Sequence, residues 1–273
     1  MIGWQRDAGD FSFFSDPRDI RLLEELHLHL DSVFPLIADT LHATVTNPIR
    51  VDIYPSHAAF LDHLRSLGWT PEDWYIGTAL SAEWILVESS NSPDNRLTSG
   101  DVASLVTHEA IHSIIFTFGT PVPQWLHEGL AGLDAALLAD CFPDCTANWD
   151  YQRSVVASVG KPGLWTMFSD PTVGYAFSTT TAMFMVKKYG WSSLQTFLTS
   201  PTDYSVFGSA DSGAFQIQWH AYLDELWGYV EPPPSTVLSI ADARGISGGA
   251  VTVEGIVTWQ LPWDARTLSL IHI

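Results

Sequence analysis

The chain carries few basic residues. Only 12 Lys and Arg stand against 31 Asp and Glu, which gives a formal net charge of -19 at pH 7. A surface this acidic repels phosphate groups, which argues against nucleic acid and against anionic membranes as partners. No apolar run reaches the ~18 residues that a membrane-spanning helix needs, so we expect no transmembrane segment.

Cysteine is nearly absent as well. The only two, Cys141 and Cys145, flank Phe-Pro-Asp, so they either close a small disulfide loop in an oxidising compartment or stay as free thiols. Two thiolates leave a tetrahedral zinc ion short of ligands, so a cysteine-only metal site is not supported. Scarce lysine beside abundant Asp, Trp, Thr and Ser suits an extracellular or cell-envelope protein, although Met1–Trp4 shows no signal sequence.

The one Gly-x-Ser-x-Gly match, Gly245–Gly249, lies in the β-like segment after the prolines and not between a strand and a helix, which disfavours a serine hydrolase. The chain does have 273 residues, 46% of them hydrophobic, which is enough for a sizeable core. Pro232–Pro234 predicts a stiff linker, and the residues after it are β-like. We therefore expect a main domain over 1–230 (an α/β part over about 1–75, catalytic helices over 76–230), a linker over 231–235, and a truncated β segment over 236–273.

The hydrophobic periodicities of the main domain predict an α+β fold. We expect strands at 10–16, 48–55, 73–78 and 83–88, and helices at 18–41, 56–67, 101–117, 124–138, 150–160, 178–189, 191–199 and 214–228. Pro35 is expected to kink or interrupt the first helix. Asp101 is expected to be the N-cap of the helix at 101–117.

The pattern His-Glu-x-x-His lies inside that helix, at His108, Glu109 and His112. On a helix the two histidines are one turn apart and share a face, so they can bind one Zn²⁺ while Glu109 polarises a water. Without a metal, these imidazoles and carboxylates would lack partners in an apolar environment, at a cost on the order of several kcal/mol.

A third ligand is predicted 16 residues after His112, at Glu128. Gly119, Pro121 and Pro123 end the first helix and turn the chain, so a second helix brings Glu128 back beside the histidines. Two histidines and one glutamate leave the fourth position for water, which is the arrangement of a hydrolytic zinc site.

These segments together resemble a known family. His108-Glu109-Ala110-Ile111-His112, followed by Pro123-Gln124-Trp125-Leu126-His127-Glu128-Gly129-Leu130-Ala131, resembles the gluzincin metallopeptidases, the thermolysin and aminopeptidase group, and looks closest to their bacterial peptidase MA-like branch. The resemblance extends over about 10–230 and includes the later segments 174–178 and 185–191. It implies a zincin-like fold in which the strand Trp84–Glu88 edges a cleft for an extended peptide or protein substrate.

The resemblance also implies roles for single residues. His108, His112 and Glu128 would be the zinc ligands and Glu109 the general base, which takes a proton from water and returns it to the leaving amine. A phenol or imidazole would stabilise the oxyanion, with Tyr175 as the candidate. The alternatives for that role are Tyr189, Tyr151 and His127. Otherwise His127 lies either behind the metal ligands or at the surface, and Asp134 could orient a ligating histidine.

Two readings of function remain open at this point. The first is a zinc peptidase; the second is an inactive extracellular zinc-binding or ligand-binding module that keeps the same fold. The segment from Ser239 through Thr258 resembles the opening strands of an OB-fold found on bacterial secreted proteins. His27, His29, His57 and His63 are spaced off a common helical face and are not expected to be ligands.

Overall fold

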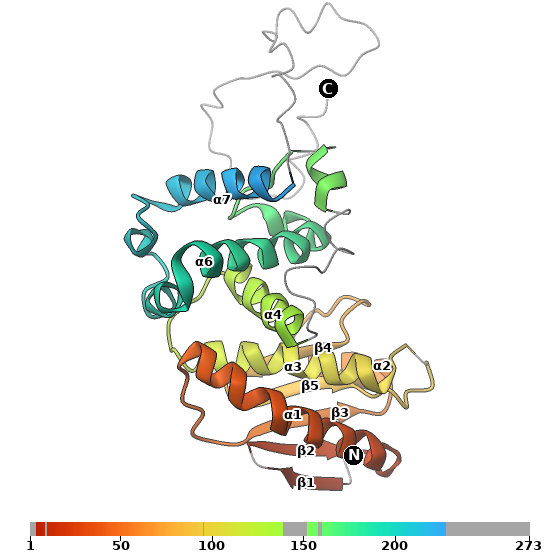
Figure 1. Cartoon of the computed structure of the whole chain (residues 1–273). Helices are drawn as coiled ribbons and strands as arrows, with labels where there is room; N and C mark the ends of the chain where they lie inside the picture. Colours follow the sequence, from red (N-terminus) through yellow and green to blue (C-terminus); the bar gives the residue numbers. More distant parts are fainter. Residues whose placement is uncertain (1–3, 9, 95, 139–151, 158–159, 228–273) are drawn as a thin grey trace, which may run out of the picture. The chain divides into compact units, whose positions relative to one another are not determined.

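The protein is described here by a computed structural model, which covers residues 4–8, 10–94, 96–138, 152–157 and 160–227 (Figure 1). All of these residues belong to one compact unit, Met1–Trp227. The linker and OB-like segment predicted at 231–273 lie outside the described residues, as do Cys141 and Cys145. The fold is mixed α+β, as expected from the sequence.

A five-stranded sheet forms one layer of the unit, with strand order β1-β2-β3-β5-β4. The central strands β2 (Phe11–Ser15), β3 (Ile49–Tyr54) and β5 (Trp84–Glu88) are parallel to one another. The outer strands β1 (Trp4–Ala8) and β4 (Gly77–Ser81) run antiparallel to their neighbours. Buried side chains alternate or run continuously along the central strands, which is why these strands sit inside the sheet.

Helices pack on the sheet. The sheet residues Tyr54 and Leu86 form a core cluster with Phe60, Leu61 and Leu64 of α2 (His57–Ser66). Helix α3 (Ser99–Phe116) contacts β3, β4 and β5, and α1 (Ile20–Leu41) lies beside it (Figure 1). Because β4 is an edge strand that α3 contacts directly, this edge and this helix together can form one side of a cleft.

The strand predictions were wrong in three respects. The strand expected at 73–78 begins only at Gly77, because residues 72–75 form a turn closed by the Tyr75 N–H and the Glu72 carbonyl, 3.1 Å apart. The strand β1 was not predicted. Trp84–Glu88 was expected to edge the cleft, but it lies between β3 and β4, and β4 is the edge.

Helix α3 begins earlier than predicted. Thr98, not Asp101, is its N-cap: Thr98 Oγ1 accepts from the Asp101 N–H at 3.2 Å, and Asp101 Oδ2 accepts from the Thr98 N–H at 2.7 Å. Asp101 is therefore the other half of a capping box. Helix α1 continues through Pro35 to Leu41, so the expected interruption does not occur. Pro35 is exposed, so water can satisfy the carbonyl that proline leaves without a partner.

A helical layer covers the far side of α3. It consists of α4 (Gln124–Leu138), α6 (Pro171–Thr199) and α7 (Ser212–Trp227), and residues 152–157 are also helical. Helix α6 joins the two helices expected at 178–189 and 191–199, which are separated only by the non-helical Gly190. The predicted start of this helix was too late. Asp170 caps the helix and Pro171 occupies its first turn, and this N-terminal signal lies seven residues before the predicted start.

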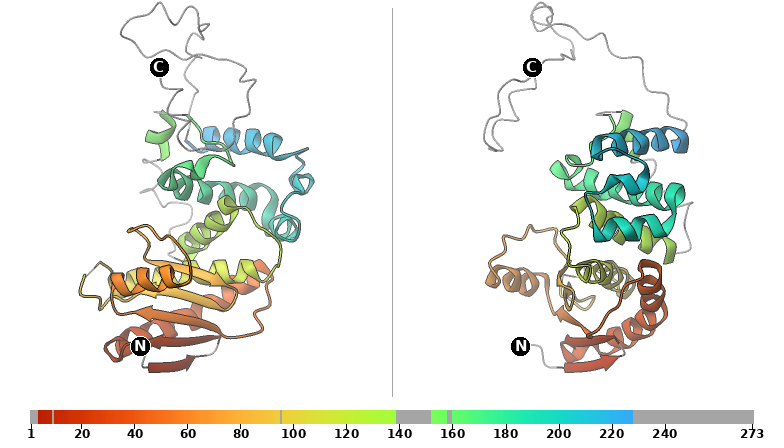
Figure 2. Two further views of the ribbon diagram at one scale, coloured as in Figure 1. Left: turned by 180° about the vertical axis from the view of Figure 1, so that it is seen from behind. Right: turned by 90° about the vertical axis from the view of Figure 1, so that its left-hand side faces the viewer.

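Glycine allows α4 to lie close against α6 in Figures 1 and 2. A Cβ atom at Gly129 would meet the Ser178 carbonyl oxygen at 2.4 Å, and one at Gly132 would meet Thr179 Oγ1 at 2.2 Å. Backbone atoms cannot move aside as a flexible side chain can. The close contact at Gly129 therefore sets the position of the neighbouring Glu128.

Substitution at this contact should destabilise the fold. We expect Gly129→Ala to lower the free energy of unfolding by about 1–3 kcal/mol, because the added methyl group overpacks the helix interface. Denaturant unfolding followed by circular dichroism would measure it. The matched control is Gly100→Ala, where the nearest atom to an added Cβ is 3.7 Å away, so its stability should be unchanged or raised. Equal stabilities of the two variants would contradict the packing described.

Candidate functional site

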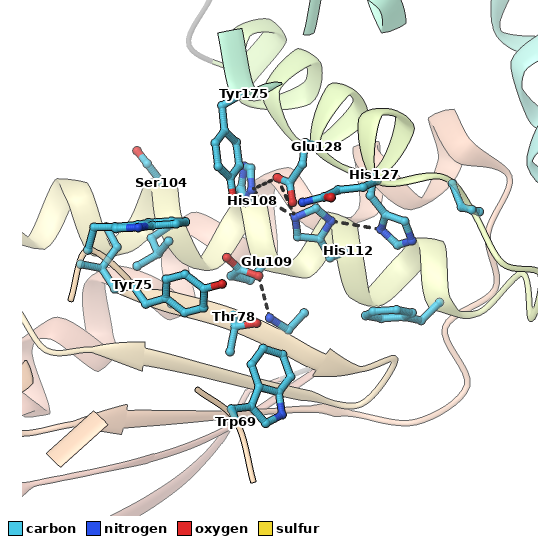
Figure 3. A pocket seen from close by; sticks show the side chains of 18 residues that line it. Trp69, Tyr75, Thr78, Ser104, His108, Glu109, His112, His127, Glu128 and Tyr175 are labelled. Atoms are coloured by element: carbon cyan, nitrogen blue, oxygen red, sulfur yellow. Dashed lines mark hydrogen bonds and ion pairs between the residues drawn. The ribbon is translucent and has the colours of Figure 1, made fainter. Parts of the chain in front are cut away.

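The predicted histidines lie on the buried middle turns of α3. The helix has apolar, fully buried neighbours there, Ala110 and Ile111, which pack it into the core. His112 and Glu109 are buried, and His108 is half-buried. His108 and His112 extend from the same side of the helix, and their rings are 4.8 Å apart edge to face (Figure 3). The helical spacing thus brings the two imidazoles together as predicted.

The turn after α3 returns the chain to these histidines. Gly119 adopts a positive φ of 66°, and the Pro123 carbonyl accepts the first helical hydrogen bonds of α4, from Leu126 at 2.9 Å and His127 at 3.1 Å. Trp125 and Leu126 are buried and anchor the start of the helix. As a result Glu128 points back at the two imidazoles (Figure 3).

Three ligand-type atoms form a small triangle at this point. The Nε2 atoms of His108 and His112 are 3.1 Å apart, and Glu128 Oε2 is 3.3 Å from the first and 3.4 Å from the second. Zinc–ligand bonds of ~2.0–2.1 Å in a tetrahedron imply ligand–ligand separations of about 3.3 Å. The three side chains therefore have the spacing that could hold a metal ion.

The charges of the triangle stabilise one another. Burial alone would raise the pKa of Glu128, but hydrogen bonds with His108 and His112 outweigh it and lower the pKa to about 2. Burial likewise opposes the charged form of His112, but the hydrogen bond to Glu128 and the negative charge of Glu109 raise its pKa overall. The ionised carboxylate suits metal ligation, and a bound metal would displace the proton that the raised pKa favours on His112.

Glu109 lies between α3 and the edge strand. Its Oε2 accepts the Ala79 N–H of β4 at 2.6 Å, which holds the carboxylate against the strand and leaves the second oxygen to accept a proton. Burial raises the pKa of Glu109, and the nearby His112 and His108 charges only partly offset this. A carboxyl group with a raised pKa is suited to general acid–base work near neutral pH.

Tyr175 extends from α6 toward His108 and Glu128 (Figure 3). It lies inside the first turns of α6, whereas the sequence placed it ahead of a helix. Burial and the negative charges of Glu128 and Glu109 raise its pKa, so the phenol stays protonated as a hydrogen-bond donor. Tyr189 is elsewhere, bonded to Gln218 and packed on Phe207. Tyr151 and the side chain of Asp134 lie outside the described residues.

His127 contacts His112 at Nδ1, the ring nitrogen that does not face His108. Its Nδ1 is 3.3 Å from Nδ1 of His112, and its ring packs 5.4 Å from that of His112 and 5.2 Å from that of Phe116. One of the two Nδ1 atoms must donate and the other accept. Burial, with the His112 charge, lowers the pKa of His127 to about 4.

A pocket of about 770 Å³ opens beside the triangle. Sequence reasoning missed several residues that line this pocket. The loop before β4 contributes chiefly Trp69, Trp74 and Tyr75, and β4 itself contributes Thr78. In Figure 3 the Tyr75 hydroxyl points toward Glu109. The sequence predicted a strand over 73–78 and not the turn that places Trp74 and Tyr75 at the pocket, so only the abundance of tryptophan gave a signal.

Two of the other histidines noted in the sequence, His29 and His57, contact core side chains away from the pocket. His29 is hydrogen-bonded to Thr107 at 3.0 Å, and burial lowers its pKa. His57 Nδ1 is 2.9 Å from Glu88 Oε2 in the core. Within the described part of the chain, His108, His112 and Glu128 form the one cluster with the spacing of a metal site.

Comparisons with known proteins add no assignment: a scan against protein-family models and a search of curated proteins gave no match. Among the described helices, none is both long and apolar enough to cross a membrane. The functional reading therefore depends on the geometry of this pocket.

The environment of His127 predicts an unusual titration. Because its pKa is lowered from 6.5 to about 4, His127 should stay neutral in the metal-free protein until the pH approaches 4. The unfolded chain takes up that proton first, so His127 should reduce the free energy of unfolding as the pH falls from 6.5 to about 4. Proton–carbon NMR of the imidazoles would measure it. A His127 titration near 6.5 would contradict the buried contact with His112.

Proposed function

We propose that this chain is a zinc-dependent peptidase with a zincin-like fold of the gluzincin type, in which Glu109 acts as general base. The observation that carries the proposal is the convergence of His108 Nε2, His112 Nε2 and Glu128 Oε2 in a pocket that Glu109 also lines. One helix supplies the paired histidines and the base, and the next supplies the third ligand. A peptide or protein is the proposed substrate.

Zinc is the metal that fits this donor set best. Two imidazole nitrogens and one carboxylate oxygen are a common catalytic zinc set, and three protein ligands leave a position open to the pocket. Glu128 Oε2 is buried, and its nearest polar neighbours are the two imidazole Nε2 atoms at 3.3 and 3.4 Å, which also suits a metal ligand. When bound, zinc would supply Lewis acidity toward water and toward a carbonyl oxygen.

Glu109 would move the proton. It accepts a proton from water as the water oxygen bonds to the scissile carbonyl carbon, and it returns that proton to the amide nitrogen as the C–N bond breaks. One water is consumed, and a carboxylic acid and an amine result, which together ionise to a carboxylate and an ammonium near neutral pH. The hydrogen bond from Ala79 N–H to Glu109 Oε2 supports this role because it fixes the carboxylate while one oxygen stays available.

Tyr175 would stabilise the oxyanion. Its phenol is neutral, lines the pocket and faces the triangle, so it can donate a hydrogen bond to the carbonyl oxygen as negative charge develops there. Tyr75 faces the same space from the loop before β4 (Figure 3). The two hydroxyls come from different elements, so substrate would lie between them.

The role of Glu109 can be separated from that of the ligands. We expect Glu109→Gln to bind zinc as the parent does but to lose about 10²–10⁴-fold in kcat, because the amide cannot accept the proton. Zinc content and hydrolysis of a mixed peptide library would be measured together. The control is Glu25→Gln on the surface of α1, which should retain full activity. A Glu109→Gln protein that cleaves as fast as the parent would refute the mechanism.

The same pair of measurements addresses the alternative of an inactive zinc-binding module. That module would bind about one zinc ion in both forms and cleave nothing in either. Hydrolysis by the parent that a chelator abolishes and added zinc restores would exclude it.

His127 is expected to support the metal without binding it. If Nε2 of His112 ligates zinc, its Nδ1 carries the proton and donates to His127 Nδ1. We expect His127→Ala to weaken zinc affinity about 10–100-fold in competition with a chelator, and His127→Asn to restore part of it. Equal zinc affinities in the parent and both variants would show that this contact does not orient His112.

A further inference from the structure

The pocket gathers exposed aromatic side chains. Five large aromatic residues are notably exposed in the described part of the chain, with exposed fractions from 40% to 60%: Trp69, Trp74, Phe116, Trp165 and Tyr175. All except Trp165 line the pocket that holds His108, Glu109 and Glu128. Exposed apolar surface is unfavourable in water, so its concentration around one site indicates a surface that a ligand covers.

Three of the pocket aromatics form a connected wall, which we define as Trp74, Tyr75 and Tyr175. The rings of Trp74 and Tyr75 are 4.4 Å apart, and those of Trp74 and Tyr175 are 6.4 Å apart, both edge to face. The wall thus joins the loop before β4 to the start of α6, two segments that are distant in the chain. It stands beside the space that Glu109 faces (Figure 3).

The wall is held in place before any ligand binds. Phe168 packs edge to face on Tyr175 with ring centres 5.6 Å apart, and Gly174 leaves room for Phe168 because a Cβ there would meet its ring at 2.4 Å. On the loop side, Arg96 donates to the Asp73 carbonyl at 3.2 Å, and the Glu88 N–H donates to the Ile76 carbonyl at 2.9 Å. A rigid aromatic surface binds an apolar group with less loss of entropy than a flexible one.

The charge of the pocket matches an apolar ligand. Its described lining contains no lysine or arginine, and its two carboxylates are Glu109 and Glu128, which the proposed chemistry already uses. Leu105 lies one turn before His108 on α3 and lines the pocket too. An acidic side chain at the wall would lose water without gaining a partner, whereas an aromatic or large aliphatic one would gain contact area.

We propose that the wall of Trp74, Tyr75 and Tyr175 is a specificity site that binds a large apolar side chain of the substrate, preferably aromatic, next to the bond that is cut. This inference rests on the proposed peptidase function for the position of that bond. The aromatic wall itself is independent of the metal ligands, so binding and cleavage can be tested separately.

The test compares two end-blocked peptides, acetyl-Ala-Ala-Phe-Ala-Ala-amide and the same peptide with Ala in place of Phe. The zinc-loaded parent should cleave the Phe peptide with a kcat/KM at least about tenfold higher. Trp74→Ala should bring this ratio close to one. The matched control is Trp165→Ala, an exposed tryptophan outside the pocket, which should keep the parent's ratio. Equal cleavage of both peptides by the parent, or an unchanged ratio in Trp74→Ala, would overturn the proposal.

Binding to the Glu109→Gln protein separates this inference from the peptidase proposal. Calorimetry with the two peptides should show tighter binding of the Phe peptide, and the additional Trp74→Ala change should remove the difference. That result with no cleavage by the parent would refute the peptidase function and leave the aromatic site standing. Equal binding of the two peptides would refute the aromatic site, whatever the parent cleaves.

Discussion

The contact of one largely buried carboxylate with two imidazoles is the constraint on which the rest of this unit depends. Glu128 can stay ionised away from water only because His108 and His112 lie 3.3 and 3.4 Å from it. Removing any partner would leave a buried polar group or charge uncompensated, which is costly in a protein interior. The two helices that carry these residues must therefore be held at a fixed distance and angle.

The surrounding elements supply that support. The sheet holds α3 from one side, and the β4 backbone at Ala79 binds Glu109 directly. On the other side α6 holds α4, at a close approach that requires glycine at position 129. The same two supports also carry the walls of the pocket, since β4 and its preceding loop bring Tyr75, and α6 brings Tyr175. Fold and site are thus built by the same contacts.

Much of the site could be predicted because it depends on local geometry. A spacing of four residues on a helix determines that His108 and His112 share a face, and a short breaker-rich turn determines that Glu128 returns to them. Tyr75 and Trp74 could not be found in this way, because their loop takes its shape from the turn at 72–75 and from contacts with distant residues. Likewise the order of β4 and β5 in the sheet depends on tertiary packing, so periodicity identified a strand at Trp84–Glu88 but not which strand is the edge. The start of α3 was misplaced because Thr98 and Asp101 are both good caps, and only their reciprocal hydrogen bonds decide between them.

X-ray absorption at the zinc edge of the purified, metal-replete protein is the most direct measurement of the metal centre. The proposed site predicts about one equivalent of zinc, with only nitrogen and oxygen neighbours at ~2.0–2.2 Å and with imidazole scattering from two histidines. Less than about 0.2 equivalents of zinc, or sulfur neighbours at ~2.3 Å, would contradict a centre built from His108, His112 and Glu128.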